Sequence, residues 1–515
     1  MPTPPHHPSP AVHRRPRRRR ELTARSLGSV LATAIFGLAT AGRAQSIPAT
    51  ELILPPTEIE HATFGNRISV EGDWMAVSAD HDAGPLAVGR VHLYRRSGES
   101  WTHHQELTAP DGHAGDHFGM PVELRDDRLL VGMPWDDDRG NRAGAVHVFR
   151  LVDDTWTWTQ KLLPATHDDT GALFGTAISF GETVDEVLVG AFLESIDADT
   201  AGGVWVFRDS GSGYEVVQRL SIGQPAGYFG RAIDVENGVL AVGAPGTFTE
   251  VGWRHGGVAI HHRENGLWVL IGVLLPANPE PYQVFGECLD LEADRLAVGS
   301  PFEDTFGVAV GAVHVYRMID GLPWLDETFG PDDPTNVSGF GFPCRFDPDG
   351  DRLAIGAYAT TANGAAESGA AWLRERIDGV WTASARLVPQ DTRPRDFFGL
   401  SAAFDGDRIL IGSPRRDGAA PDTGGVIGFR MRDCDTSGDL DVWEIAAGVV
   451  ADLNEDGVPD ECQNPIGDLN GDGVVDGADI GLFSTIWGTD GGGVGDVNGD
   501  GIVDGADLAL ILAGW

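Results

Sequence analysis

Residues 229–245, FGRAIDVENGVLAVGAP, have the pattern of a short β-hairpin that follows a Phe-Gly pair. The residues after Phe229 alternate in polarity, Asn237-Gly238 is a signal for a type I′ turn, and VLAVG is an apolar run suited to a strand buried on both faces. The same arrangement recurs as FGMPVELRDDRLLVGMP at residues 118–134 and as FGECLDLEADRLAVGSP at residues 285–301. The stretch is therefore one copy of a repeat.

Seven Phe-Gly pairs divide the chain into units, with 54 to 58 residues between successive pairs. A unit contains four short stretches with strand character, including sequences such as GAVHVFR and WTWTQKL, and no helical period. Strands repeated at this spacing predict an all-β, seven-bladed β-propeller with one blade per unit. The pairs begin at Phe64, Phe118, Phe174, Phe229, Phe285, Phe340 and Phe398.

The seventh unit lacks a fourth strand of its own. It ends with GGVIGFRM at residues 424–431, whereas ATELILPP at residues 49–56 precedes the first Phe-Gly pair and matches the fourth-strand sequences QELTAP and QKLLPA. We expect the N-terminal strand to complete the last blade. Such closure removes the free sheet edge that a linear array would expose.

Phe-Gly followed by Val-Gly-Ala-Pro at residues 242–245 resembles the FG-GAP repeat of integrin α-chain propellers, and the resemblance covers residues 45–432. It implies a seven-bladed propeller that serves as a binding surface. Members of that family often carry a calcium loop between the first two strands of a blade. The corresponding turns here are short, such as RDDR, ENG, EADR and DGDR, and DPDGD at residues 347–351 comes nearest. We therefore expect a propeller mostly without bound calcium.

The propeller sequence offers no strong catalytic motif, and we assign no catalytic residue. His92, His147 and His314 occupy one repeat phase, so they lie in different blades and cannot share a metal ion. The acidic loops WDDDRGN at residues 135–141 and ESIDADT at residues 194–200 are interpreted as solvated turns, with a weak cation or ligand site as the alternative. A Ser-centred nucleophile elbow, a zinc motif and a phosphate loop are all missing from the sequence.

The last 83 residues, 433–515, contain 19 carboxylates and no basic residue. Two almost identical strings stand out, GDLNGDGVVDGADIGLF at residues 467–483 and GDVNGDGIVDGADLALI at residues 495–511. Their oxygen spacing, with glycine at the sixth place, fits a twelve-residue Ca²⁺ loop in which the seventh residue contributes its carbonyl. The predicted ligands are Asp468, Asn470, Asp472, Val474, Asp476 and Asp479 in the first loop and Asp496, Asn498, Asp500, Ile502, Asp504 and Asp507 in the second.

A short apolar helix is predicted after each loop. Loop-plus-helix units duplicated in this way resemble the type I dockerin, over residues 465–515. The resemblance implies a cohesin-like partner, read through the tenth and eleventh loop places. These are Gly477-Ala478 and Gly505-Ala506. The alternative is a calcium-locked cap without a partner. The expected apolar faces consist of Ile480, Phe483 and Trp487 in the first helix and Leu508, Ile511, Leu512 and Trp515 in the second.

Residues 433–464 form a weaker EF-hand-like segment between the propeller and the dockerin-like region. Its first loop is complete, whereas Pro459 and Gln463 interrupt the second. The predicted calcium ligands are Asp433, Asp435, Ser437, Asp439, Asp441 and Glu444 in the first loop and Asp452, Asn454 and Asp456 in the second. Four cysteines allow two disulfides in an exported protein, and we predict Cys434–Cys462 and Cys288–Cys344.

Residues 1–44 have the organisation of a signal peptide. A basic stretch at residues 13–20 precedes an apolar run at residues 27–39, which is too short to span a membrane as a helix, and Gly42-Arg43-Ala44 suits cleavage. Arg19-Arg20 leaves a twin-arginine route open beside the general one. We predict secretion to the exterior or the cell surface, with the periplasm as an alternative. No later segment has the character of a membrane helix.

The chain has 37 basic and 77 acidic residues, and residues 1–44 hold eight of the basic and one of the acidic ones. The remainder, with 29 basic and 76 acidic residues, has a formal charge of −47, which argues against nucleic-acid and anionic-lipid partners. The sequence favours an exported, calcium-binding, non-catalytic protein whose propeller presents a surface to a glycan or protein ligand. One alternative is a polysaccharide-degrading or carbohydrate-binding component of an extracellular assembly, and another is a structural or adhesive surface protein.

Overall fold

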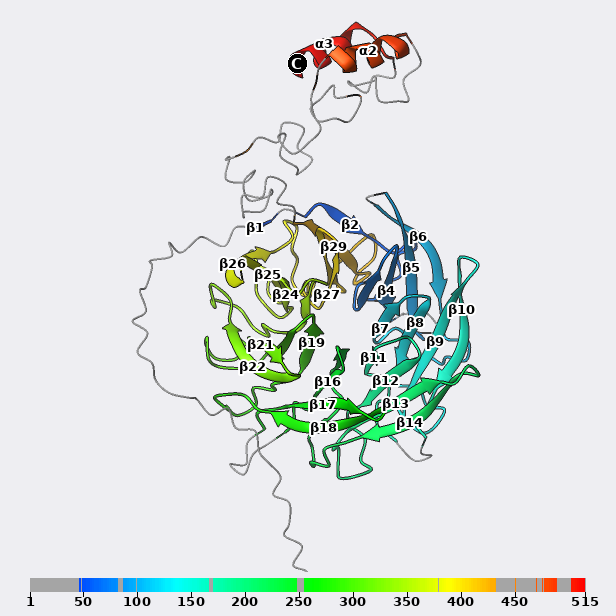
Figure 1. The fold of residues 1–515 in the computed structure, drawn as a ribbon, viewed down its shortest axis with the longest axis vertical. Coiled ribbons are helices and arrows are strands. Elements are labelled where there is room, and N and C mark those ends of the chain that lie inside the picture. The colour runs from blue at the N-terminus through cyan, green and yellow to red at the C-terminus, as the bar shows by residue number, and fades with distance from the viewer. Residues whose placement is uncertain are drawn as a thin grey trace, which may run out of the picture.

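The computed structural model describes residues 46–47, 49–81, 87–98, 100–165, 170–247, 254–377, 379–431, 450, 469, 475, 477–488 and 502–514. Seven antiparallel sheets lie around a common axis, with the first strand of each sheet toward the centre (Figure 1). The predicted seven-bladed all-β propeller is confirmed. We number the blades in chain order from the unit that follows Phe64.

The first four blades are uninterrupted meanders of four strands. Blade 1 consists of β3 (Ile68–Glu71), β4 (Trp74–Ala79), β5 (Arg90–Ser97) and β6 (Ser100–Leu107). Blade 2 consists of β7 (Val122–Arg125), β8 (Arg128–Met133), β9 (Ala145–Val152) and β10 (Thr155–Leu162). Blade 3 consists of β11 (Ala177–Phe180), β12 (Glu186–Ala191), β13 (Gly203–Asp209) and β14 (Tyr214–Leu220). Blade 4 consists of β15 (Ile233–Glu236), β16 (Val239–Gly243), β17 (Val258–Glu264) and β18 (Leu267–Leu274).

Blade 5 is a meander of the same kind, and the last two blades also take strands from the N-terminal region. Blade 5 consists of β19 (Cys288–Glu292), β20 (Arg295–Ser300), β21 (Ala312–Ile319) and β22 (Leu322–Phe329). Blade 6 consists of β23 (Cys344–Phe346), β24 (Arg352–Ala357), β25 (Ala370–Ile377) and β26 (Val380–Leu387), and β1 (Ser46–Ile47) is added to it. Blade 7 consists of β27 (Ser401–Asp405), β28 (Arg408–Ser413), β29 (Gly425–Arg430) and β2 (Glu51–Ile53).

The ring is closed by the N-terminal strand, as the sequence predicts. Strand β2 pairs antiparallel with β29, and Ile53 lies opposite Val426. Strand β1 is an addition that the sequence did not indicate, because it pairs in parallel with β26, with Ser46 opposite Arg386. The outer edges of two neighbouring blades are therefore covered by consecutive segments of one strand region.

The Phe-Gly pair joins each blade to the one before it. All seven Phe side chains are fully buried. Phe174, for example, forms a parallel bridge with Gly144 of the preceding blade. Gly175 has a φ of +95°, and a Cβ atom there would lie 2.5 Å from the carbonyl oxygen of Ala145. Only glycine allows so close an approach of two backbones, which explains why the pair recurs in every unit.

The predicted C-terminal helices are present as α2 (Gly477–Ile486) and α3 (Gly505–Gly514). Phe483 and Ile511 are buried in a small core that also contains Val475 and Val503. Two predicted core residues differ: Trp487 is half exposed, although its ring contacts Phe483, and Leu512 is 49% exposed. Among the described residues, no helix is both long and apolar enough to cross a membrane.

Candidate ligand-binding face

One face of the propeller carries both the links that precede each Phe-Gly pair and the loops that join the second and third strands. Because successive strands are antiparallel, these two kinds of loop meet at the same end of every blade. We call this end of the ring the FG face. The residue before each Phe has a positive φ, for example 58° at His117 and 54° at Tyr228. The links therefore share one backbone conformation, and the blades differ there mainly in their side chains.

Aromatic rings cluster on the FG face, and arginine side chains lie over them. The ring centroids of His117 and Trp135 are 4.2 Å apart, and those of Phe192 and Tyr228 are 6.1 Å apart. Attraction between a guanidinium and the face of a ring accounts for the arginine positions. The pairs are Arg142 over Trp135 at 4.4 Å, Arg231 over Phe192 at 5.4 Å, Arg254 over Tyr228 at 5.5 Å and Arg415 over Phe397 at 4.9 Å.

A pocket of about 260 Å³ opens where blades 3, 4 and 5 meet on this face. Arg231 and Glu287 form an ion pair of 2.6 Å in its wall. Arg254 Nη1 donates a hydrogen bond to the Tyr228 hydroxyl at 3.2 Å. Tyr282 is 63% exposed beside them. The pocket, which we call the Tyr228 pocket, thus combines aromatic rings with polar groups, as small-molecule sites usually do. Its lining consists of Phe192, Tyr228, Arg231, Pro245, Gly246, Arg254, Tyr282, Val284 and Glu287.

A second cavity of about 390 Å³ follows the axis of the ring and is lined by the first strands of the blades. The side chain five places after each Phe enters it, and in four blades an oxygen of this side chain accepts a hydrogen bond from a backbone N–H of the next blade. The bonds are Leu124 N to Ser69 Oγ at 2.9 Å, Phe180 N to Glu123 Oε1 at 3.1 Å, Leu291 N to Asp234 Oδ2 at 2.6 Å and Phe346 N to Asp290 Oδ2 at 2.6 Å.

The carboxyl groups in the channel are electrostatically strained. Burial raises the pKa of Glu123 and that of Asp234 to about 7, and the neighbouring charge of Asp290 adds to the shift at Asp234. Arg345 Nη1 lies 2.6 Å from Asp290 Oδ1. Burial opposes the charge of Arg345, but Asp290 raises its pKa overall. Since these groups are used in bonds between blades, we assign the channel a structural role.

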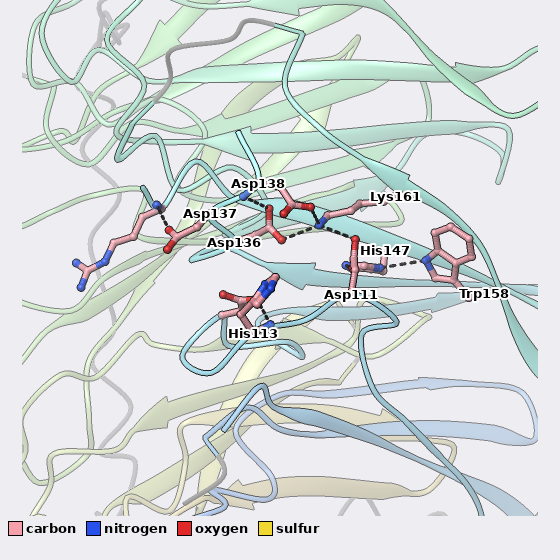
Figure 2. Close-up of polar contacts among 10 residues, drawn as sticks. Asp111, His113, Asp136, Asp137, Asp138, His147, Trp158 and Lys161 are labelled. Atoms are coloured by element: carbon pink, nitrogen blue, oxygen red, sulfur yellow. Dashed lines mark hydrogen bonds and ion pairs between the residues drawn. The ribbon is translucent and has the colours of Figure 1, made fainter. Parts of the chain in front are cut away.

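The acidic loop at residues 135–141 is neutralised from within the protein. Figure 2 shows the Lys161 ammonium, on β10, surrounded by three carboxylates. Its Nζ lies 3.0 Å from Asp111 Oδ2, 2.7 Å from Asp136 Oδ2 and 2.5 Å from Asp138 Oδ2. The Asp136 side chain is 1% exposed, so the interpretation of this loop as a solvated turn is wrong for that residue. Burial alone would lower the pKa of Lys161, but the three carboxylates raise it above its ordinary value.

The loop at residues 194–200 has the same arrangement, with arginine in the place of lysine. Arg219 Nη2 lies 2.5 Å from the buried Glu194 Oε2, and Arg219 Nη1 lies 2.8 Å from Asp197 Oδ2. Trp205 Nε1 donates to Glu194 Oε1 at 2.9 Å. The sequence carries a signal for both sites, because QKL and QRL end the fourth strands of blades 2 and 3. Within the described part of the chain, no group of three or more His, Cys, Asp or Glu side chains is arranged to hold a metal ion.

The three histidines of one repeat phase lie in separate blades, as the sequence predicts. Burial lowers the pKa of His92 and that of His147 to about 4, so both are neutral at physiological pH. His147 Nδ1 accepts a hydrogen bond from Trp158 Nε1 at 3.1 Å (Figure 2). His314 Nε2 lies 2.8 Å from Glu303 Oε2. These contacts lie within single blades and give the histidines a structural role.

Among the predicted calcium ligands, Asp479 and Asp507 are fully buried in the first turns of α2 and α3. Leu469 N donates to Asp479 Oδ1 at 2.8 Å, and Asp504 N donates to Asp507 Oδ2 at 2.8 Å. Ile502 is 54% exposed. The predicted partner-binding residues, Gly477-Ala478 and Gly505-Ala506, begin the two helices and are exposed. Outside the described residues lie Asp468, Asn470, Asp472, Val474, Asp476, Asp496, Asn498, Asp500 and all the ligands predicted within 433–464.

The predicted disulfide partners Cys288 and Cys344 lie side by side in the first strands of blades 5 and 6. Both are buried, their Sγ atoms are 2.7 Å apart, and the structure describes them as free thiols. Burial raises the pKa of Cys344 well above its ordinary value. The structure thus places the two side chains together, and the bond itself stays a prediction. Cys434 and Cys462 lie outside the described residues.

Comparison with known families identifies the repeat. Residues 101–149 and 381–426 match the model of the FG-GAP repeat. Each match runs from the last strand of one blade, through a Phe-Gly pair, to the third strand of the next. No curated protein matches the chain significantly. FG-GAP propellers are typically binding folds rather than catalytic ones. The chain therefore contains FG-GAP repeats, and its repeats form a seven-bladed β-propeller of a type that usually binds ligands.

Proposed function

We propose that this chain is an exported, calcium-binding, non-catalytic binding or adhesion protein whose FG face receives the ligand. The arginine-over-ring pairs around the Tyr228 pocket carry the ligand-binding part of this proposal. They join hydrogen-bond donors to flat apolar surfaces at one place, which is the composition expected of a ligand site. The buried polar groups of the channel and of the acidic loops, in contrast, are already paired within the protein.

The C-terminal region is proposed to fold around Ca²⁺. Its 19 carboxylates have no basic residue near them in the sequence, so an internal cation of the Lys161 kind is missing from the region itself. Asp479 and Asp507, the twelfth residues of the two loops, are buried and accept loop N–H groups. Their placement fits a loop closed by its last ligand. Because the metal binds the native loop, its binding energy adds to the stability of the fold. The folded region would then tether the propeller to a cohesin-like or other extracellular protein.

Calorimetry of the full chain tests the calcium proposal. In millimolar Ca²⁺ we expect one transition from the propeller and another from the C-terminal region. With a chelator, the second transition should vanish while the first barely moves. Asp507→Asn should weaken the calcium effect, whereas Asp490→Asn, outside both twelve-residue loops, is the matched control. A C-terminal transition that is the same with and without the chelator would contradict the proposal.

A further inference from the structure

We infer that the Tyr228 pocket binds a glycan through a single carboxylated sugar residue, with Arg254 receiving the carboxylate. The inference rests on the proposed ligand-binding role of the FG face and specifies its ligand. It follows from three features of the pocket: a guanidinium that no described carboxylate neutralises, a group of aromatic ring faces, and a volume that suits one ring. The position of the pocket at the junction of blades 3 and 4 brings these features together.

Arg254 is unusual in a chain with twice as many acidic as basic residues. It is exposed and forms no ion pair with any described residue, and its described contacts are the Tyr228 ring and hydroxyl and the Tyr282 N–H, which donates to its carbonyl at 2.6 Å. Arg231, also in the pocket, is already paired with Glu287. The Arg254 guanidinium is therefore available to hold a carboxylate with two parallel hydrogen bonds, an arrangement that lysine cannot match.

The rings favour a sugar as the carrier of this carboxylate. Phe192, Tyr228 and Tyr282 border the same hollow, and the electron-rich face of an aromatic ring attracts the C–H groups on one face of a pyranose. The volume of about 260 Å³ lies below the ~300–1,000 Å³ of sites for drug-sized molecules, which suits one monosaccharide ring. The Arg231–Glu287 pair supplies donors and acceptors for ring hydroxyls.

The charge of the whole molecule limits the ligand to few carboxylates. A chain with a formal charge of −40 repels a polyanion at long range, and one exposed arginine does not reverse that field. A glycan with one acidic residue experiences little of this repulsion and still gains the local contact with Arg254. We therefore expect a neutral chain that carries an isolated uronic-acid-type unit, rather than a polyuronate.

Titration calorimetry of the full chain with three probes tests the inference. The probes are a trisaccharide with one terminal glucuronic acid, the same trisaccharide with glucose in its place, and the peptide Gly-Glu-Gly. We expect the acidic trisaccharide to bind at least tenfold more tightly than the other two probes. Arg254→Gln should abolish that preference, and Tyr282→Ala should weaken both trisaccharides. The control is Arg317→Gln, a half-exposed arginine of β21 whose partner is Asp326.

Equal binding of the acidic and neutral trisaccharides, or an Arg254→Gln variant with wild-type affinity, overturns the inference. Equal or tighter binding of Gly-Glu-Gly overturns it in favour of an acidic peptide. If the neutral trisaccharide binds and Tyr282→Ala weakens it, the carboxylate inference falls while the ligand-binding role of the face stands. If none of the probes binds, the inference falls, and a screen of the Tyr282→Ala variant against the native secretome decides the proposed function separately. All these variants change exposed side chains, and thermal unfolding confirms that they fold.

Discussion

At the scale of single residues, the protein neutralises its acidic loops with its own cations. Lys161 and Arg219 occupy equivalent places before the last residue of a fourth strand, and each faces a carboxylate that is almost completely buried. An ammonium group in such a place does the work of a metal ion, but it is always bound. The two loops therefore need no divalent ion to remain compact, unlike the loops proposed for the C-terminal region.

The Lys161 site gives a direct stability prediction. Lys161→Met leaves the Asp136 carboxylate buried without a cation, and breaking a buried pair in this way costs about 3–5 kcal/mol. Denaturant unfolding at pH 7 measures the loss. Arg150→Met is the control, because Arg150 and Asp127 form a pair in which both side chains are well exposed, and such pairs contribute less than about 1 kcal/mol. Equal losses in the two variants would show that the Lys161 cluster is not a buried site.

Glu123 gives a prediction of pH dependence. Its pKa in the folded protein is about 7, above its ordinary value of 4.5, so the folded state binds the proton more tightly than the unfolded state. This contribution to stability is complete below pH 4.5 and is lost as the pH rises through 7. Glutamine keeps the acceptor for Phe180 N without the charge. Glu123→Gln should therefore match the wild type near pH 5 and exceed it at pH 8, by on the order of 1 kcal/mol because water in the channel screens the charge.

Thermal and denaturant unfolding at several pH values measure this difference. Glu71→Gln, at the exposed end of β3, controls for the substitution itself. A constant difference between Glu123→Gln and the wild type from pH 5 to pH 8 would mean that Glu123 does not titrate in this range.

At the scale of elements, strand β2 shows how three residues complete a sheet. Ile53 is 6% exposed and packs in the core that blades 7 and 1 share, whereas its neighbour Leu52 is 45% exposed. Ile53→Ala should therefore lower the free energy of unfolding by about 2–4 kcal/mol. Leu52→Ala, on the same strand, should change it by less than about 0.5 kcal/mol. If both substitutions are neutral, β2 does not contribute to the folded ring in solution.

The elements could be predicted from sequence much better than the site. The Phe-Gly spacing, the short hairpins and the missing fourth strand all repeat, so each copy supports the interpretation of the others. The Tyr228 pocket does not repeat: Phe192, Tyr228 and Tyr282 come from three units, and no single copy contains the pattern. The Lys161 cluster was missed for a related reason. Its carboxylates belong to two loops, and only the fold shows that both reach the end of β10.

At the scale of the whole molecule, the ring is held by contacts between consecutive blades. Phe-Gly pairs bridge neighbouring backbones, and Ser69, Glu123, Asp234 and Asp290 accept hydrogen bonds from the next blade around the channel. These bonds all run in one direction, from the side chain of one blade to the backbone of its successor. Stability is therefore shared among interfaces of one design, as in other repeat proteins.

The pairing of β2 with β29 also determines when the molecule can become complete. Ile53 is among the first described residues to leave the ribosome, yet its partner Val426 is made more than 370 residues later. Throughout synthesis the early segment must wait without its sheet, and contacts between such distant residues form slowly. In that interval the outer edge of β29 is equally open to the same segment of a second chain. Crowded nascent chains should therefore exchange their first strands, which makes an interlocked dimer the characteristic misassembly of this propeller.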